Sequence, residues 1–241
     1  MGLDGKQVLV IGGGSGIGFA VAEGAAAEGA AVTIASTNAE RLAEAAAKLG
    51  GDVQAAALDI TDEPAVQAFF AGRGFDHIVT TAGDWGGPRR AALADMDIAG
   101  QAAIFKVRFW GALTVAKHGA AALSPGGSLT LTGGMIAHKP ARGSAASTAM
   151  AGAIEFLTRG LAVELAPLRV NCVCPGYILT GVWDSIPAAQ REARLAGLAA
   201  GQLIPRIGEP AEAAQAYLYA MKAGFTTGQV LYAEGGLALG G

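Results

Sequence analysis

The stretch Val8-Leu9-Val10-Ile11-Gly12-Gly13-Gly14-Ser15-Gly16-Ile17-Gly18 decides the fold. Its four leading apolar residues predict a strand that is buried on both faces. Glycines end this strand, and residues 19–28 then carry Ala, Val and Glu at helical spacing. A turn this tight needs residues without side chains, and the first free N–H groups of the following helix point back into it. The stretch therefore predicts a strand–turn–helix unit that can hold a diphosphate.

The spacing of the glycines is G-x-x-x-G-x-G, at Gly12, Gly16 and Gly18. It is not the G-x-G-x-x-G pattern, because Ile17 stands where that pattern has its third glycine. The variant resembles the one that the short-chain dehydrogenase/reductase family uses to hold NAD(P). The alternative is a turn that only packs a helix onto a strand. The resemblance implies that the cofactor contacts Gly12, Gly14, Ser15, Gly16, Ile17 and Gly18.

Composition argues against several classes of protein. The chain has 241 residues, 52% of them hydrophobic, which suits one large α/β domain. A net charge of −3 without a basic block does not predict nucleic-acid binding. We expect no membrane span and no signal peptide, since residues 1–11 lead directly into a strand. Cys172 and Cys174, the two cysteines, are interpreted as small buried residues, and we expect no metal and a cytoplasmic location.

Strand-like and helix-like segments alternate along the whole chain. This alternation predicts a doubly wound, Rossmann-type parallel sheet of about seven strands with helices on both faces, in a single domain over residues 1–241. Ligands of such sheets bind at the carboxyl ends of the strands. We expect strands near 6–11, 31–35, 53–58, 75–81, 128–132, 168–174 and 229–232, and helices near 17–28, 39–49, 62–71, 98–123, 145–166 and 210–221.

The polar residues after the second expected strand bear on the choice of cofactor. An acidic side chain here would hold the adenosine ribose 2′-OH and repel a 2′-phosphate, and the sequence has none. Ser36, Thr37 and Asn38 can donate to a phosphate, and Arg41 adds positive charge. We therefore expect NADP rather than NAD. The alternative is that these residues only cap a helix.

The resemblance continues at the ends of the third and fourth strands. Asp59 and Ile60 stand where family members contact adenine, although Asp59 could instead cap a helix. Thr81-Ala82-Gly83 stands where the family has N-A-G, beside the cofactor ribose.

The sixth strand and the segment after it also match the family. Pro175-Gly176 stands where the family flanks the nicotinamide, Ile178 where it binds the carboxamide, and Thr180 where it touches the phosphates. Residues 182–205 match the variable substrate lid, and their amphipathic spacing predicts one or two helices.

The family's catalytic residues are missing from the matching positions. Family members protonate the substrate oxygen with the tyrosine of a Tyr-x-x-x-Lys pair, aided by a serine, and an asparagine holds a relay water. Residues 133–155 contain no tyrosine, and no Tyr-x-x-x-Lys pair occurs in the chain. The resemblance therefore indicates an atypical member. The positions of the tyrosine, lysine, serine and asparagine hold Ser147, Ala151, Gly134 and Arg108.

Two functions follow from this departure. The first is an NAD(P)-dependent oxidoreductase, with hydride transfer to a carbonyl or from an alcohol and with Arg108, His138 or Tyr177 as non-standard acid–base residues. Their alternative roles are a buried ion pair for Arg108, a solvent-facing side chain for His138 and a lid contact for Tyr177. The second function is a catalytically impaired member that acts as a nucleotide-binding or regulatory protein.

Two expected helices, 98–123 and 145–166, are apolar over more than one face. In the resembling family these helices build a dimer interface, often within a tetramer. We therefore expect a homodimer or homotetramer that acts on a small-molecule substrate.

Overall fold

Seven parallel strands form one central sheet in the computed structural model, which describes residues 2–83 and 91–240. The strand order is β3-β2-β1-β4-β5-β6-β7, and each neighbouring pair is parallel. The order reverses between β1 and β4, which is where doubly wound sheets bind their ligands. The strands are β1 (Gln7–Ile11), β2 (Ala31–Ser36), β3 (Gln54–Ala57), β4 (Phe75–Thr80), β5 (Leu123–Thr132), β6 (Arg169–Pro175) and β7 (Val230–Ala233).

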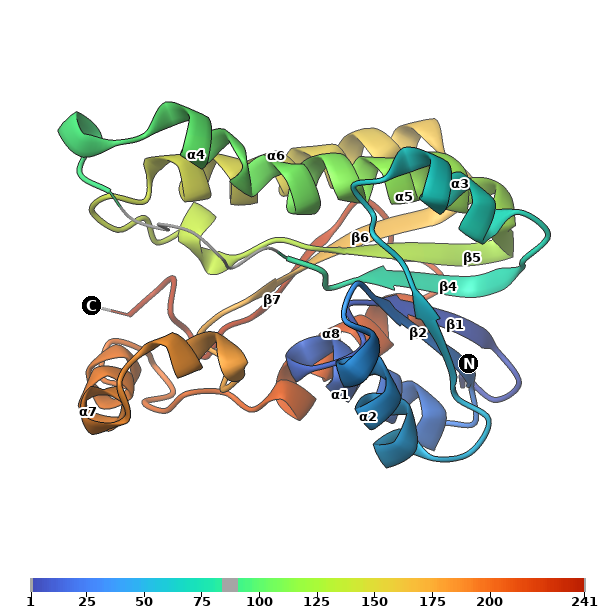
Figure 1. Cartoon of the computed structure of the whole chain (residues 1–241), viewed down its shortest axis with the longest axis horizontal. Helices are drawn as coiled ribbons and strands as arrows, with labels where there is room; N and C mark the ends of the chain where they lie inside the picture. Colours follow the sequence, from blue (N-terminus) through green and yellow to red (C-terminus); the bar gives the residue numbers. More distant parts are fainter. Residues whose placement is uncertain (1, 84–90, 241) are drawn as a thin grey trace.

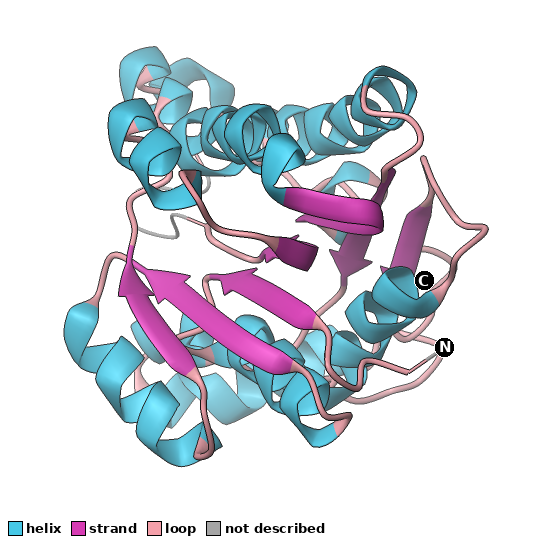
Figure 2. Ribbon diagram, turned by 90° about the vertical axis from the view of Figure 1, so that its right-hand side faces the viewer, coloured by secondary structure: helices cyan, strands magenta, loops and turns pink. Residues whose placement is uncertain are grey.

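Helices cover both faces of the sheet (Figures 1 and 2). This is a single-domain α/β Rossmann-like fold, so the predicted fold class is confirmed. Across the described residues, no helix combines the length and apolar character that a bilayer crossing requires. One face carries α1 (Gly16–Ala27), α2 (Ala39–Leu49) and α8 (Pro210–Lys222), and the other carries α3 (Glu63–Phe70), α4 (Ile98–Ala102), α5 (Ala112–Gly119) and α6 (Ala145–Glu164).

The residues of β1 divide between two hydrophobic cores. Leu9 and Ile11 pack with the α3, α5 and α6 layer, whereas Val8 and Val10 pack with the α1, α2 and α8 layer. All four side chains are at most 1% exposed. A strand with apolar side chains on both faces is typical of a parallel sheet between two helical layers, as the sequence predicts.

The expected helix over 98–123 is broken in the structure. After α4 the chain forms a π-helical segment (Lys106–Gly111) before α5 begins. Gly111 permits close packing at this point, because a Cβ on it would lie 2.7 Å from Ile60 Cγ1. Widened turns of this kind are frequent at functional sites, and this one carries Arg108.

The segment expected to form a lid contains a short 3₁₀ helix, η5 (Gly181–Ser185), and the helix α7 (Ala188–Ala199). Its two ends meet at a backbone bridge, where Gly208 N donates to Tyr177 O and Leu179 N donates to Gly208 O. In Figure 1, α7 stands apart from the helices that cover the sheet.

Candidate active site

The turn between β1 and α1 forms a cradle because its glycines leave no room for side chains. Gly12 and Gly16 have positive φ angles of 92° and 55°. A Cβ on Gly12 would lie 2.5 Å from Thr81 Oγ1, and one on Gly18 would lie 2.2 Å from Gly12 O. Ser15 is the N-cap of α1, yet its side chain makes no capping bond. The first N–H groups of α1 thus face the turn, an arrangement that fits a diphosphate.

Thr81 joins the ends of β4 and β1 at the point where the strand order reverses. Its backbone N–H donates to Ile11 O at 2.8 Å, and its hydroxyl donates to the same oxygen at 3.2 Å. The residue that stands where the family has asparagine therefore fixes the wall of the cradle. Ala82 follows it and packs against the core.

Arg41 lies beside the glycine turn. A Cβ on Gly14 would be 3.7 Å from Arg41 Cβ, so the exposed side chain of Arg41 starts beside the turn that is predicted to hold the phosphates. Asn38 Oδ1 accepts from Arg41 N at 2.8 Å and caps α2, so Asn38 has the capping role that the sequence allowed. Ser36 Oγ accepts from Asn38 N at 3.4 Å, and Thr37 is exposed. The cluster therefore lines the edge of the cradle where a 2′-phosphate would lie.

The turn after β3 holds Asp59 in place without using it as a helix cap. Asp59 Oδ1 accepts from the backbone N–H and the hydroxyl of Thr61, each at 2.8 Å, and these bonds lower the pKa of Asp59. Asp62, not Asp59, caps α3 by accepting from Ala65 N. A hollow of about 650 Å³ between β3 and α3 includes Asp59 and Thr37 in its lining. The hollow runs beside β3 and along α3 to Arg73, just beyond the end of that helix.

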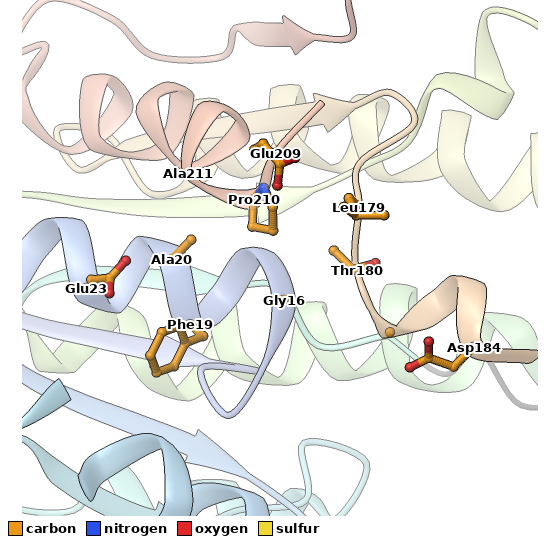
Figure 3. A pocket seen from close by; sticks show the side chains of 11 residues that line it. Gly16, Phe19, Ala20, Glu23, Leu179, Thr180, Asp184, Glu209, Pro210 and Ala211 are labelled. Atoms are coloured by element: carbon orange, nitrogen blue, oxygen red, sulfur yellow. The ribbon is translucent and has the colours of Figure 1, made fainter. Parts of the chain in front are cut away.

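A groove of about 510 Å³ lies on the other side of the glycine turn (Figure 3). Thr180 lies close to Gly16 across this groove. A Cβ on Gly16 would be 3.2 Å from Thr180 Cγ2. Two residues predicted to contact the phosphates thus meet across the groove. Its other lining comes from α1, the residues before and in η5, and the start of α8, and includes the carboxylates Glu23, Asp184 and Glu209.

The segment that follows β6 contains the residues that the sequence analysis expects beside the nicotinamide. Pro175 ends the strand, and Gly176 packs so closely on β7 that a Cβ would lie 2.7 Å from Glu234 Cα. The Ile178 carbonyl accepts from Trp183 Nε1 at 2.7 Å. Tyr177 contacts the same indole edge-to-face at 6.1 Å, so it makes the lid contact that was its alternative role.

Arg108 brings a buried positive charge to the carboxyl edge of the sheet. Its side chain is 8% exposed, and Nη1 donates to Gly133 O at 3.2 Å. A Cβ on Gly83 would lie 2.7 Å from Arg108 Nε, so a side chain at residue 83 would displace the guanidinium. The guanidinium therefore lies between the ends of β4 and β5, next to Thr81-Ala82-Gly83.

The positions that match the family's serine, tyrosine and lysine lie on adjoining elements. Gly134 follows β5, and a Cβ on it would meet no atom within 4 Å. Ser147 is half-buried in the first turn of α6, and Ala151 is buried one turn further along. The structure therefore leaves open space at the Cβ position of residue 134.

His138 does not simply face solvent, because it contacts a residue that the sequence analysis missed. Its Nε2 lies 2.5 Å from Oε1 of Glu155, whose side chain is 6% exposed. Cys174 Sγ donates to the same oxygen at 3.3 Å, and Tyr232 OH lies 3.2 Å from His138 Nε2. The available signal was a carboxylate four residues after Ala151, a spacing that places both residues on one face of the expected helix.

Both cysteines are fully buried thiols, and within residues 2–83 and 91–240 no three His, Cys, Asp or Glu side chains gather as metal ligands. The neighbouring Cys172, together with burial, raises the pKa of Cys174. Cys174 is therefore a neutral hydrogen-bond donor to Glu155 rather than a reactive thiolate.

Comparison with known proteins identifies the family. A family model described as enoyl-(acyl carrier protein) reductase matches residues 12–238. The short-chain dehydrogenase/reductase malC of Malbranchea aurantiaca is 38% identical over 255 residues, covering 98% of this chain and 96% of its own. The chain therefore belongs to the short-chain dehydrogenase/reductase family.

Solved structures agree with this assignment. The structure of the MalC Reductase/Diels-Alderase from Malbranchea aurantiaca has a TM-score of 0.90 at 37% identity and covers 98% of both chains. A small-chain dehydrogenase in complex with NADPH has a TM-score of 0.85 at 34% identity, covering 98% of this chain and 100% of its own.

Proposed function

We propose that this chain is an NADP-dependent oxidoreductase that transfers a hydride between the cofactor and a small carbonyl compound or alcohol. The observation that carries the proposal is the glycine cradle with Arg41 beside Gly14 and no acidic residue directly after β2. The NADPH complex of the similar dehydrogenase supports this choice of cofactor. The word reductase in the description of MalC supports reduction as the direction.

The residues that would hold the cofactor follow the carboxyl edge of the sheet. Residues 12–18 would bind the diphosphate, Arg41 and its neighbours the 2′-phosphate, and Asp59 the adenine amino group. The wall of Pro175, Gly176 and Ile178 would flank the nicotinamide. Bound there, the cofactor would supply the hydride, and the protein would supply orientation, a dry pocket and proton handling.

The chemistry around the substrate differs from the family pattern. Without a phenol at residue 147 and an ammonium at residue 151, the usual proton donor is missing, and such assistance is worth ~10²–10⁴-fold. Arg108 is our candidate for stabilising negative charge on the substrate, because its guanidinium lies at the ends of β4 and β5. Residues 182–205 would close over the substrate as a lid.

The test is NADPH oxidation against a panel of aldehydes, ketones and imines, combined with calorimetric titration of NADPH and NADH. We expect tighter binding of NADPH and substrate-dependent oxidation by at least one member of the panel. Absence of binding by both nucleotides would overturn the proposal.

A nucleotide-binding protein without turnover is the second candidate function. The residues at the family's catalytic positions favour this candidate. None of Ser147, Ala151 and Gly134 can act as the proton donor that the family's tyrosine provides. NADPH binding with no substrate-dependent oxidation would support it. A turnover rate that falls when Arg108 is changed would contradict it.

We also propose a cytoplasmic homodimer or homotetramer. The apolar side chains of Phe156, Val163 and Trp110 are 69%, 81% and 59% exposed on or beside the helices that the family uses for its dimer. Sedimentation analysis at micromolar concentration tests the assembly, and a monomer would contradict it.

A further inference from the structure

A continuous run of proton-carrying side chains leads from the surface to the inner face of α6. Tyr232 on β7 is 50% exposed, and its phenol reaches His138 Nε2 at 3.2 Å. The His138 side chain is 33% exposed, and its Nε2 reaches Glu155 Oε1 at 2.5 Å. Glu155 is 6% exposed, so the run starts in solvent and ends at a buried carboxylate.

The inner end of this run lies on the face of α6 that adjoins the candidate active site. Ser147, Ala151 and Glu155 are four residues apart, and residues at this spacing follow one face of a helix. Side chains in a helix lean toward its N-terminus, so the Glu155 carboxylate leans toward Ala151. Gly133 also adjoins this place, because a Cβ on it would lie 2.6 Å from Cys174 Sγ and 3.9 Å from Ala151 O.

The hydrogen bonds permit two arrangements of one proton. In the first, Glu155 is ionised and accepts from His138 Nε2–H and from the Cys174 thiol. In the second, Glu155 carries the proton and Nε2 accepts from Glu155 or from the Tyr232 hydroxyl. The arrangements differ by the transfer of one proton between Glu155 and His138, over a short contact. Such a transfer is the elementary step of a proton relay.

The groups that surround the pair come from every element packed against it. Cys172 and Cys174 face it from β6, Tyr232 from β7, and Arg159 acts on Tyr232 from the next turn of α6. Partial burial, followed by the charge of Glu155, raises the pKa of Tyr232. The phenol therefore stays protonated at neutral pH and can donate.

We propose that Tyr232, His138 and Glu155 form a proton relay that supplies the candidate active site from solvent. The inference rests on the proposed function, because hydride addition to a carbonyl leaves an oxygen that needs a proton. Glu155 gives up one proton toward that atom, Tyr232 and water then deliver one to His138 Nε2, and His138 passes this proton on to Glu155. The bound reduced nicotinamide would supply the hydride and become the oxidised form, so atoms and charge balance. Glu155 and His138 act here as positioning and relay residues, since neither is shown to touch substrate.

The first test needs no substrate. Proton NMR of the purified full-length protein, without substrate or cofactor, should show the His138 Nε2 proton that is held by Glu155, identified by its loss in His138→Asn. We expect this signal to be lost in Glu155→Gln and to exchange severalfold more slowly with deuterated water in Tyr232→Phe. Glu164→Gln, at the exposed end of the same helix, is the matched control and should leave the signal unchanged. Exchange that Tyr232→Phe does not slow would overturn the relay.

The second test uses turnover with the best substrate of the carbonyl and imine panel. We expect Glu155→Gln to lower kcat by roughly 10²-fold, to change the pH profile of kcat and to leave the Kd for NADPH within twofold. A purely structural role would change stability or NADPH binding and leave the pH profile intact, which would contradict the relay. Failure of the wild-type protein to bind NADPH would instead reject the proposed function, and the exchange experiment would still decide whether the relay exists.

Discussion

Thr81 stands so close to Gly18 that a Cβ on the glycine would lie 2.4 Å from Thr81 Oγ1. The contact couples the end of β4 to the first turn of α1, and it leaves residue 18 no space for a side chain. The shape of the nucleotide cradle therefore depends on two elements that are far apart in the sequence.

Gly18→Ala should destabilise the protein by roughly 1–3 kcal/mol and abolish NADPH binding, because the new methyl group overlaps Gly12 O and Thr81. Gly197→Ala is the matched control. Gly197 lies in α7 with open space around its Cβ position, so this change should be neutral or stabilising by up to about 1 kcal/mol. Thermal unfolding and calorimetric titration measure both effects. A Gly18→Ala protein that binds NADPH normally would contradict the cradle.

Arg41→Ala should weaken the binding of NADPH about tenfold and leave the binding of NADH unchanged. The guanidinium next to Gly14 can pair with a 2′-phosphate, and only NADPH carries one. Titration of both nucleotides into both proteins is the measurement. Equal loss for NADPH and NADH would mean that Arg41 acts on the turn itself and not on the phosphate.

Arg108→Lys should lower kcat by about tenfold or more while the Kd for NADPH changes little. Lysine keeps the charge but cannot reproduce the planar fork that reaches Gly133 O across Gly83. Arg142→Lys, an exposed position in the segment before α6, is the control and should retain full activity. Unchanged kcat in Arg108→Lys would assign the side chain to structure alone.

The stability of the fold should depend on pH through His77. Burial, and next the charge of Arg169, lowers the pKa of His77 from 6.5 to about 4, and its Nδ1 lies 2.9 Å from Ser128 Oγ. The unfolded chain therefore binds this proton more readily, so the free energy of unfolding falls as pH drops from 6.5 to about 4. The total loss is roughly 3 kcal/mol. Chemical denaturation at several pH values should show this slope in the wild type and lose it in His77→Gln.

The first βα unit was predictable because its signal is local. A run of apolar residues, a glycine spacing and a helical pattern lie within residues 8–28, and together they predict a strand, a turn and a helix. The break between α4 and α5 was not predictable, since it depends on Gly111 packing against Ile60, about fifty residues earlier in the chain.

The Glu155 cluster shows why the site was harder to predict than the fold. Glu155 meets His138 from the loop after β5, Cys174 from β6 and, through His138, Tyr232 from β7. No spacing in the sequence links these residues, and the sheet order alone brings them together. By contrast, Arg41 lies five residues after the end of β2, and the pairing of β2 with β1 brings it beside the glycine turn.

The bridge between Ile178 and Gly208 means that the intervening segment leaves and rejoins the body of the protein at nearly one point. Insertions, deletions or whole replacements between these residues would leave β6 and α8 where they are. Exchanging this whole segment would thus be a way to accommodate new substrates while the rest of the fold stays unchanged.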